Sequence, residues 1–296
     1  GMRADAGLAK LLGVSRTRAA ELTQAGVVQM NGEAIGKSDL LRAGVLEITT
    51  TEVERPEPEV VPVVVPDLGI LYEDEHMVVV DKPALLAAHP SVGWEGDTVL
   101  GALAGLGIAV STSGAAERQG IVQRLDVGTS GVMAVAKSER AYSVLKQAFR
   151  DRTPKKIYHA LVAGHVDPMV GTIDAPIGRH PGSAWKFAVV DGGRDSITHY
   201  EVIEMLPGAS LVEVELETGR THQIRVHMSA LGHPCLGDRL YGADANQAGE
   251  LGLERQWLHA LKLEIDHPIT GKLMTFDSPY PQDLENSLEQ LRDRYL

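Results

Sequence analysis

The sequence of 296 residues predicts an α+β protein, with a small N-terminal α/β module followed by a large domain whose sheet is mixed and mainly antiparallel. Beyond residue 67, many short β-rich runs occur with few helical segments between them, unlike the regular strand–helix repeat of a doubly wound parallel sheet. Four prolines among acids and valines at 52–67 indicate an extended linker. We therefore predict a module at 2–51, this linker, and a large domain at 68–296. A short edge strand at 60–65 is the alternative for half of the linker.

The composition narrows the class of protein. With 44% hydrophobic and 23% charged residues, the chain is predicted to be globular with a sizeable core. A single cysteine excludes an internal disulfide and a multi-cysteine zinc site. No apolar run approaches the ~20 residues that span a bilayer, and we expect a cytosolic protein. The net charge is −12, yet bases outnumber acids between residues 124 and 156. This stretch predicts a local basic face for a polyanion, although a solvated helix gives the same pattern.

The N-terminal module is predicted to contain two helices and a small sheet. Leucines at helical spacing over 8–12 indicate the first helix, and Ser15 is placed to cap a second helix over 16–25. An Asn-Gly pair at 31–32 between β-rich residues predicts a hairpin, and a final strand is expected at 45–49. Basic side chains near the first helical turns are candidate RNA contacts: Arg3, Arg16 and Arg18.

The large domain is predicted to be rich in strands. Runs of β-forming residues place these strands at 70–73, 77–81, 132–136, 157–162, 197–203 and 211–217. Ser138 is placed to cap a helix between the third and fourth of them. Thr221 is expected to cap a second helix over 222–231, which Gly232 ends.

One carboxylate, Asp126, lies in a glycine-flanked loop between two apolar runs. Arg124 precedes it by two residues, and the hydroxyls of Thr129 and Ser130 follow it, so the carboxylate can be held charged and aimed. Gly128 allows a tight turn. The alternative is an ordinary Asx-turn between two strands.

Two further segments carry candidate site residues. Tyr158 follows two lysines at the start of a predicted strand. In the predicted helix 222–231, His222 and Arg225 share a face, so Arg225 can point into a cleft. His222 and His227 are five residues apart, which is the wrong spacing for paired metal ligands on a helix, so we predict no metal site. No nucleotide-binding glycine pattern occurs either.

Taken in order, these segments resemble the RluA-type pseudouridine synthase family over 69–281. The motifs are Arg-Leu-Asp-x-x-Thr-Ser-Gly at 124–131, Lys-x-x-Tyr-x-Ala-Leu-Val at 155–162, Gly-Arg-Thr-His-Gln-Ile-Arg-Val-His at 219–227 and Leu-His-Ala at 258–260. The N-terminal module resembles an S4 RNA-binding domain through Ser-Arg-Thr-Arg-Ala at 15–19 and Val-Gln-Met-Asn-Gly at 28–32. This combination is similar to the RluD branch, whose members act on large-subunit rRNA.

The resemblance implies an isomerase that converts uridines in RNA to pseudouridine. It implies that Asp126 is the nucleophile, that Tyr158 stacks on the target base and assists proton removal, and that Arg225 pairs with the carboxylate. It also implies an RNA partner, namely 23S rRNA or the assembling large subunit, with no cofactor, membrane or obligate protein partner. The implied RNA and substrate contacts are Gln123, Arg124, Thr129, Ser130, Lys156, Arg220, His222 and Gln223. Gln123 stands where the family usually has histidine.

Two other functions are compatible with parts of the pattern. A nucleoside or glycoside hydrolase could use Asp126 as its nucleophile, but it would need a second carboxylate, and none lies beside these motifs in a comparable loop. A non-catalytic RNA-binding protein would need no carboxylate at this position and would tolerate Asp126→Asn.

Overall fold

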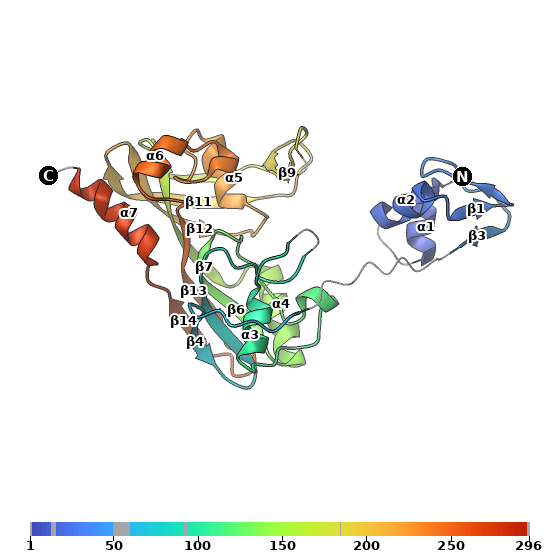
Figure 1. Ribbon diagram of the computed structural model, residues 1–296, viewed down its shortest axis with the longest axis horizontal. Helices are drawn as coiled ribbons and strands as arrows, with labels where there is room; N and C mark the ends of the chain where they lie inside the picture. Colours follow the sequence, from blue (N-terminus) through green and yellow to red (C-terminus); the bar gives the residue numbers. More distant parts are fainter. Residues whose placement is uncertain (1, 13–15, 50–59, 92–93, 184, 295–296) are drawn as a thin grey trace. The chain divides into compact units, whose positions relative to one another are not determined.

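The computed structural model describes residues 2–12, 16–49, 60–91, 94–183 and 185–294 (Figure 1). The chain divides into two compact units, Gly1–Glu57 and Pro58–Leu296, which are considered separately below. The predicted cap Ser15 and the part of the linker at 52–59 lie outside the described residues.

The small unit contains the predicted helices and strands. They are α1 (Ala4–Leu12), α2 (Arg16–Gln24), β1 (Val28–Met30), β2 (Glu33–Ala34) and β3 (Leu46–Ile48), with the strands in the order β2-β1-β3. Asn31 and Gly32 have φ of 55° and 82°, as expected for the two central residues of a type I′ hairpin turn. Leu8 of α1, Ala19 of α2 and Val28 of β1 are fully buried together, so the apolar faces of helices and sheet form one small core.

The second half of the predicted linker packs on the large unit. Val60, Val63 and Val65 lie against its main core, and the N–H of Val63 donates to the carbonyl of Gly101, 3.0 Å away, in α3 (Val99–Gly105). A Cβ on Gly105 would come within 2.0 Å of the Val63 carbonyl oxygen, so only glycine permits this approach. No strand forms among residues 60–65.

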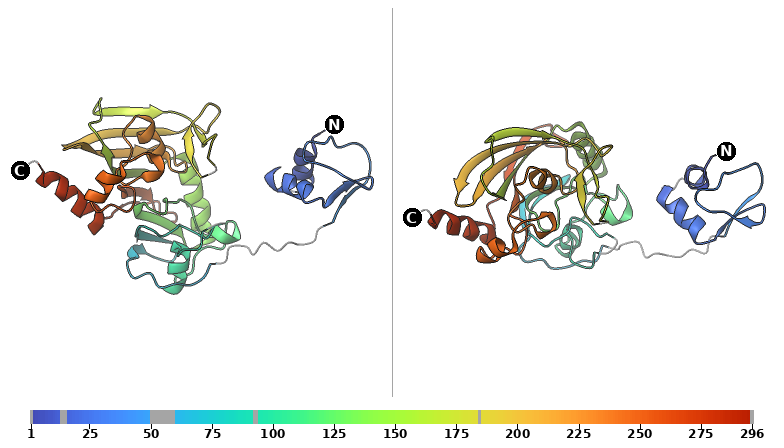
Figure 2. Two further views of the ribbon diagram at one scale, coloured as in Figure 1. Left: turned by 45° about the horizontal axis from the view of Figure 1, so that its top comes forward. Right: turned by 90° about the horizontal axis from the view of Figure 1, so that it is seen from above.

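A nine-stranded sheet forms the centre of the described part of the large unit (Figures 1 and 2). Its strands are, in spatial order, β4 (Gly69–Glu73), β5 (Met77–Lys82), β6 (Ser130–Ala136), β13 (Leu258–Asp266), β7 (Lys155–Ala163), β12 (Ala209–Leu216), β11 (Ile197–Leu206) and β8 (Val170–Asp174), with β14 (Leu273–Asp277) on β13. The β6–β13 pair is parallel and the other described pairs of this sheet are antiparallel, which confirms the predicted mixed, mainly antiparallel sheet.

Helices cover both halves of this sheet. They are α4 (Glu139–Asp151), α5 (Gln223–Ala230), α6 (Ala245–Glu250) and α7 (Gln282–Asp293). Ser138 caps α4 as predicted, because its Oγ accepts from the N–H of Ala141 at 3.2 Å. Figure 1 shows α3 and α4 beside β4–β6, and α5 and α6 beside β11. The predicted cap of α5 is wrong: His222 occupies the N-cap position, in a left-handed conformation with φ of 57°. A separate hairpin, β9 (Ile177–Arg179) and β10 (Phe187–Val189), lies next to α5.

The parallel β6–β13 pair depends on Gly131. This residue faces Ala260 of β13 and has φ of 115°, where L-residues are strained. A Cβ at this position would lie 2.2 Å from the Ala260 carbonyl oxygen. Since β6 begins four residues after Asp126, the pairing fixes where the Asp126 loop enters the sheet.

We expect Gly131→Ala to destabilise the large unit by at least about 3 kcal/mol, because the backbone strain and the steric overlap add. Urea unfolding followed by tryptophan fluorescence measures this, since all three tryptophans lie in the large unit. Gly249→Ala in α6 is the matched control, because nothing lies within 4 Å of its added Cβ. It should be neutral or stabilise by up to about 1 kcal/mol. Equal unfolding midpoints for the two variants would contradict the argument.

Candidate active site

The loop that carries Asp126 is held by backbone hydrogen bonds at both of its ends. The N–H of Thr129 donates to the Asp126 carbonyl at 3.0 Å, which closes the turn into β6. The N–H of Leu85 donates to the Val127 carbonyl at 2.8 Å, which ties the loop to the segment after β5. The carboxylate therefore has a fixed position on the wall of a cavity, with 16% of its side chain exposed.

A fully buried lysine, Lys82, also holds the Asp126 loop in place through hydrogen bonds to backbone carbonyls. Its ammonium donates to the carbonyls of Pro83 (2.9 Å), Leu86 (2.8 Å) and Val127 (3.4 Å). Burial lowers the pKa of Lys82 to about 7, and the charge of Asp126 partly opposes this effect. Lys82 thus joins two loops through three backbone carbonyl groups.

Arg225 is the charged partner of Asp126. Its Nη1 lies 3.3 Å from Asp126 Oδ2, and its Nε (2.6 Å) and Nη2 (3.0 Å) bind both oxygens of Asp238. Burial disfavours the guanidinium charge, but the hydrogen bonds and charges of the two carboxylates raise the pKa of Arg225 further above its usual value. The ring of Tyr241 lies under the guanidinium, 5.0 Å from its carbon. Arg225 is therefore permanently charged and held rigidly.

The groups near Asp126 in sequence do not aim it, contrary to the prediction. Arg124 donates instead to the hydroxyl of Thr221. Thr129 Oγ1 accepts from Gln256 Nε2 at 3.2 Å, and Ser130 Oγ is hydrogen-bonded to His259 Nδ1 at 2.9 Å. Ser130 is only 1% exposed, and its hydrogen bond supports the β6–β13 contact. Thr129 still lines the cavity at Asp126.

Tyr158 of β7 lines the same cavity as Asp126. Its burial, together with the nearby charge of Asp126, raises the pKa of its phenol far above the usual value. The phenol therefore stays protonated at neutral pH. It offers an apolar ring face and a hydroxyl to a ligand, and it does not offer a phenolate base.

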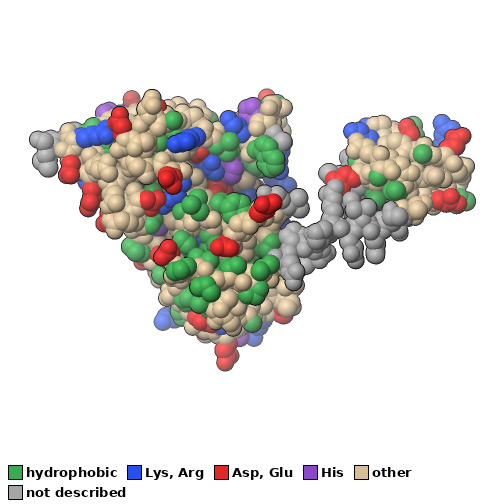
Figure 3. Space-filling model, viewed as in Figure 1, with side chains coloured by type: hydrophobic (Ala, Val, Ile, Leu, Met, Phe, Trp, Pro, Cys, Tyr) green, Lys and Arg blue, Asp and Glu red, His purple; other side chains and the backbone are tan. Residues whose placement is uncertain are grey.

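Two adjoining cavities meet at the site. The smaller one, of about 60 Å³, is lined by Asp126, Tyr158 and His222 among others. The larger one, of about 670 Å³, shares Arg124, Tyr158, Leu216, Gly219 and Arg220 with it. The described lining of the larger cavity contains no Asp or Glu, and its cationic side chains are Arg118, Arg124, Lys146, Arg150, Lys156 and Arg220. Figure 3 shows Lys, Arg and His side chains where this face is hollowed, beside α5 and β9. The predicted local basic face is thus present on an acidic protein.

Lys156 is the most enclosed cation of the large cavity that shows a perturbed pKa. Burial, and then the charge of Arg152, lower the pKa of Lys156 to about 8, with Glu215 opposing. A phosphate placed beside this ammonium would favour its charged form. The position of Lys156 in the cavity agrees with its predicted role as an RNA contact.

His222 is fixed by two aromatic rings. Its ring is edge-to-face with Phe187 (5.7 Å between centroids) and with Tyr241 (5.6 Å), and its Nδ1 lies 2.8 Å from the Tyr241 hydroxyl oxygen. That oxygen accepts from the N–H of Phe187 at 3.1 Å, so its own proton is free to be donated to His222 Nδ1. Burial lowers the pKa of His222, which favours the neutral ring. We therefore assign the proton of His222 to Nε2. The residue itself lines two cavities together with Asp126.

Two of the predicted contacts with substrate are occupied or buried. The amide of Gln223 accepts from Thr218 Oγ1 (2.8 Å) and the N–H of Arg220 (3.0 Å), and its Nε2 donates to two groups of β11. Gln223 lines the cavity at Asp126, but its amide is fully engaged by these hydrogen bonds and positions Arg220. The Nε2 of Gln123, at the wall of the large cavity, is buried and makes no hydrogen bond with any described residue.

The N-terminal arginines belong to the small unit. Arg3 is paired with Asp5 at 3.2 Å. Arg16 and Arg18 lie on α2, and their side chains are outside the described residues.

Sequence reasoning missed Lys82, Asp238 and Tyr241. The signal for Lys82 is a lysine that ends a continuous apolar strand just before a proline. For Asp238 and Tyr241, which follow the motif helix within a glycine-rich turn, no spacing in the sequence indicates contact with Arg225.

Residues 76–230 match the family model described as RNA pseudouridylate synthase. The chain belongs to this family. It is an RNA pseudouridine synthase, an isomerase, and the RluA-type resemblance of the large domain is confirmed.

Named relatives and a solved structure agree with this assignment. An uncharacterized RNA pseudouridine synthase of Mycobacterium tuberculosis is 58% identical over 293 residues, covering 99% of this chain and 95% of the relative. The ribosomal large subunit pseudouridine synthase D of Pseudomonas aeruginosa is 41% identical over 287 residues, covering 94% and 88%. The structure of human RNA pseudouridylate synthase domain containing 1 has a TM-score of 0.62 and 27% identity, and the match covers 79% of this chain and 96% of the human one. No described helix is long and apolar enough to cross a membrane.

Burial of Lys82 should make the stability of the synthase depend on pH. The pKa of Lys82 is about 7 in the folded state against 10.5 ordinarily, so between pH 7 and 9 the unfolded state binds more protons and stability rises with pH. Relative to Lys82→Met, the free energy of unfolding of the wild type should increase by about 2 kcal/mol over this range. Urea unfolding at several pH values measures this. Parallel pH profiles for the two proteins would contradict it.

Proposed function

We propose that this synthase isomerises specific uridines of 23S ribosomal RNA to pseudouridine, with Asp126 as the nucleophile. The observation that carries the proposal is the ion pair between buried Arg225 and Asp126, which lies on the wall of a cavity that also presents Tyr158. A carboxylate paired with a fixed guanidinium, largely removed from bulk water, is suited to attack or to proton abstraction at a sugar carbon.

The reaction is an internal rearrangement of one nucleotide. The bond between N1 of uracil and C1′ of ribose breaks, a bond between C5 and C1′ forms, and the hydrogen at C5 leaves as a proton. Asp126 would either attack C1′ or take a proton from C2′ to give a glycal, and both routes use the same carboxylate. Because nothing is oxidised and no group is imported, the chemistry requires no cofactor.

The neighbouring side chains fit the needs of a detached uracil. Tyr158 would support the face of the base with its ring, and its protonated hydroxyl can donate to an oxygen of the base. His222 would donate from Nε2 to the nucleotide, since its Nδ1 is already engaged by Tyr241. The target uridine must leave the helical stack to reach these groups, which favours loops or weakened helices as substrates.

The larger cavity supports an RNA substrate. Its cationic lining, without a described acid, suits the phosphates that flank a flipped nucleotide. The relatives named ribosomal large subunit pseudouridine synthase D, at about 40% identity, support 23S rRNA as the source of that nucleotide. An rRNA substrate would place the enzyme in the cytoplasm.

A hydrolase is less well supported by the same geometry. Among the described residues that line the small cavity, Asp126 is the only carboxylate, whereas glycoside hydrolysis commonly uses two. Asp238 cannot supply the second, because both of its oxygens bind Arg225.

We infer that the small unit is an S4-like RNA-binding domain. Its two helices and three strands follow the order expected from that resemblance. Its contribution would be additional contacts with the rRNA outside the catalytic cavity.

Asp126→Asn should abolish isomerisation while preserving the fold, because the amide has the shape of the carboxylate but neither its charge nor its nucleophilicity. We expect the rate to fall at least about 10⁴-fold, with RNA affinity changed only a few-fold. Tritium release from 23S rRNA labelled at C5 of uridine measures the reaction, since bond formation at C5 expels that hydrogen. Release by both proteins would show that Asp126 is not the nucleophile.

Deletion of residues 1–55 should weaken RNA binding at least about tenfold and leave a folded catalytic unit. The reason is that the small unit has its own core and the large unit begins at Pro58. Filter binding to 23S rRNA measures affinity, and circular dichroism checks the fold. Unchanged affinity together with unchanged choice of uridines would refute a role for this domain in binding.

A further inference from the structure

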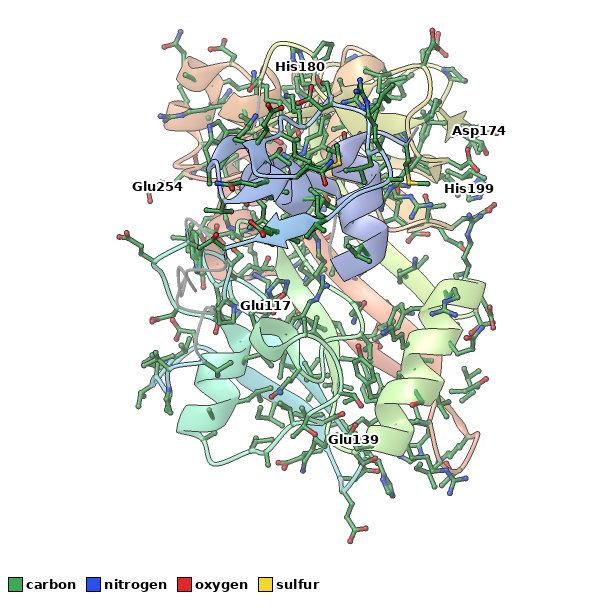
Figure 4. The ribbon with its side chains drawn as sticks, turned by 90° about the vertical axis from the view of Figure 1, so that its right-hand side faces the viewer. Glu117, Glu139, Asp174, His180, His199 and Glu254 are labelled. Carbon is green, nitrogen blue, oxygen red and sulfur yellow. The ribbon has the colours of Figure 1, made fainter. Side chains whose placement is uncertain are left out.

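A second buried arginine, Arg255, binds the main chain of the Asp126 loop. Its Nη1 donates to the carbonyl of Gly128, which is 3.0 Å away and two residues after Asp126. The side chain of Arg255 is 5% exposed, and the residue is not among the described ones that line the cavities of the site. Figure 4 labels Glu254, the exposed residue directly before it. Arg255 therefore reaches the loop from within the protein and not from a cavity.

The beginning of α7 orients this guanidinium. Nε (2.7 Å) and Nη2 (3.0 Å) of Arg255 donate to the two oxygens of Asp283, the second residue of α7. Such a bidentate pair fixes the plane of a guanidinium, so that Nη1 keeps one direction. Arg225 is held in the same way, because its Nε and Nη2 bind Asp238 and its Nη1 is left for Asp126. One arginine thus holds the carboxylate of the loop, and the other holds its backbone.

The residue after Arg255 packs against the same loop. A Cβ on Gly128 would lie 2.4 Å from Oε1 of Gln256, so the loop backbone is in direct contact with this amide. The Nε2 of Gln256 donates to Thr129 Oγ1 at 3.2 Å, and the N–H of Thr129 donates to the Asp126 carbonyl at 3.0 Å. A displacement of the Gly128 carbonyl would therefore move Asp126 as well.

We propose that Arg255 is a positioning residue for the isomerisation, which holds the backbone of the loop so that the carboxylate of Asp126 stays beside Arg225. The inference rests on the proposed function, since it takes Asp126 as the reacting carboxylate. Misplacement of a reacting group by about 1 Å can lower a rate about 100-fold. The contact should therefore matter more for the reaction than for RNA affinity. The alternative is that Arg255 only joins α7 to the large unit, which would affect stability alone.

Arg255→Met tests the proposal, because it keeps an unbranched apolar chain and removes all three donated hydrogen bonds. Asp283 is 40% exposed, so water can solvate the carboxylate that loses its partner. We expect kcat for 23S rRNA to fall about 10- to 100-fold and KM to change less than about threefold. Arg255→Lys should recover part of the loss in kcat, since an ammonium can still donate to the Gly128 carbonyl. Tritium release from 23S rRNA labelled at C5 of uridine measures both constants.

Arg292→Met is the matched control. Arg292 also joins α7 to the sheet, because its Nε (2.9 Å) and Nη2 donate to the carboxylate of Glu204 in β11, and none of its described hydrogen bonds is with the Asp126 loop. This variant should keep the kcat and KM of the wild type. An equal loss of kcat in Arg292→Met, or an unchanged kcat in Arg255→Met, would overturn the proposal.

Amide hydrogen exchange, followed by mass spectrometry without RNA, tests the contact independently of the substrate. The N–H groups of Leu85 and Thr129 donate to carbonyls of the loop, at 2.8 and 3.0 Å. Both should exchange at least about tenfold faster in Arg255→Met, the factor that corresponds to losing one hydrogen bond from a charged donor. Strand β11 should exchange as in the wild type. Unchanged exchange of the loop, or uniformly faster exchange across the large unit, would show that Arg255 does not position the loop.

The outcomes separate this inference from the proposed function. Tritium release by the wild type, together with equal kcat and equal loop exchange in Arg255→Met, would refute the positioning role alone. Faster exchange confined to the loop in Arg255→Met, without tritium release from 23S rRNA by the wild type, would support the positioning role and refute the proposed substrate.

Discussion

The proposed role of Asp126 as nucleophile imposes one constraint on the site, which is that a negative charge must be accommodated while it is largely removed from water. Arg225 satisfies this constraint, and Asp238 in turn holds Arg225 by two hydrogen bonds. A buried arginine with two carboxylates leaves one net negative charge, so Asp126 is stabilised without being fully neutralised. Under the proposed mechanism, a guanidinium bound tightly to Asp126 alone would compete with the attack of this carboxylate on a ribose carbon. The arrangement in which Asp238 takes the bidentate face avoids that competition.

The fold meets this constraint by bringing distant segments to one place. Asp126 precedes β6, Tyr158 lies on β7 and Arg225 on α5, and the parallel pairing of β6 with β13 sets the order of the strands. Gly131 makes that pairing possible, because no side chain fits beneath the Ala260 carbonyl. Lys82 then fixes the loop from the opposite side through backbone carbonyls. Several independent contacts therefore fix the position of the carboxylate, as electrostatic preorganisation requires.

The distribution of charge matches the same function. The chain as a whole is acidic, with a net charge of −12, while the described lining of the larger cavity is basic. An acidic body weakens indiscriminate attraction to nucleic acid, so that affinity depends on the local cationic groups and on the shape of the cavity. His222, which lines the smaller cavity at Asp126, contacts the β9–β10 hairpin through Phe187 and the turn after α5 through Tyr241. The hairpin and the start of α5 are thus joined by ring contacts beside the cavity at Asp126.

The sequence by itself determined the mixed sheet, the hairpin at Asn31, the helix capped by Ser138 and the motifs around Asp126, Tyr158 and Arg225, because local propensity and short motifs encode these. Only the tertiary structure decided which groups meet. Arg124, Thr129 and Ser130 are neighbours of Asp126 along the chain but bind elsewhere, whereas Arg225, 99 residues away, is its partner. Asp238, Tyr241 and Lys82 were missed for the same reason. Contacts between buried charges depend on the order of the strands and on the hydrogen bonds that remain available after folding. Neither of these can be predicted from a local stretch of sequence.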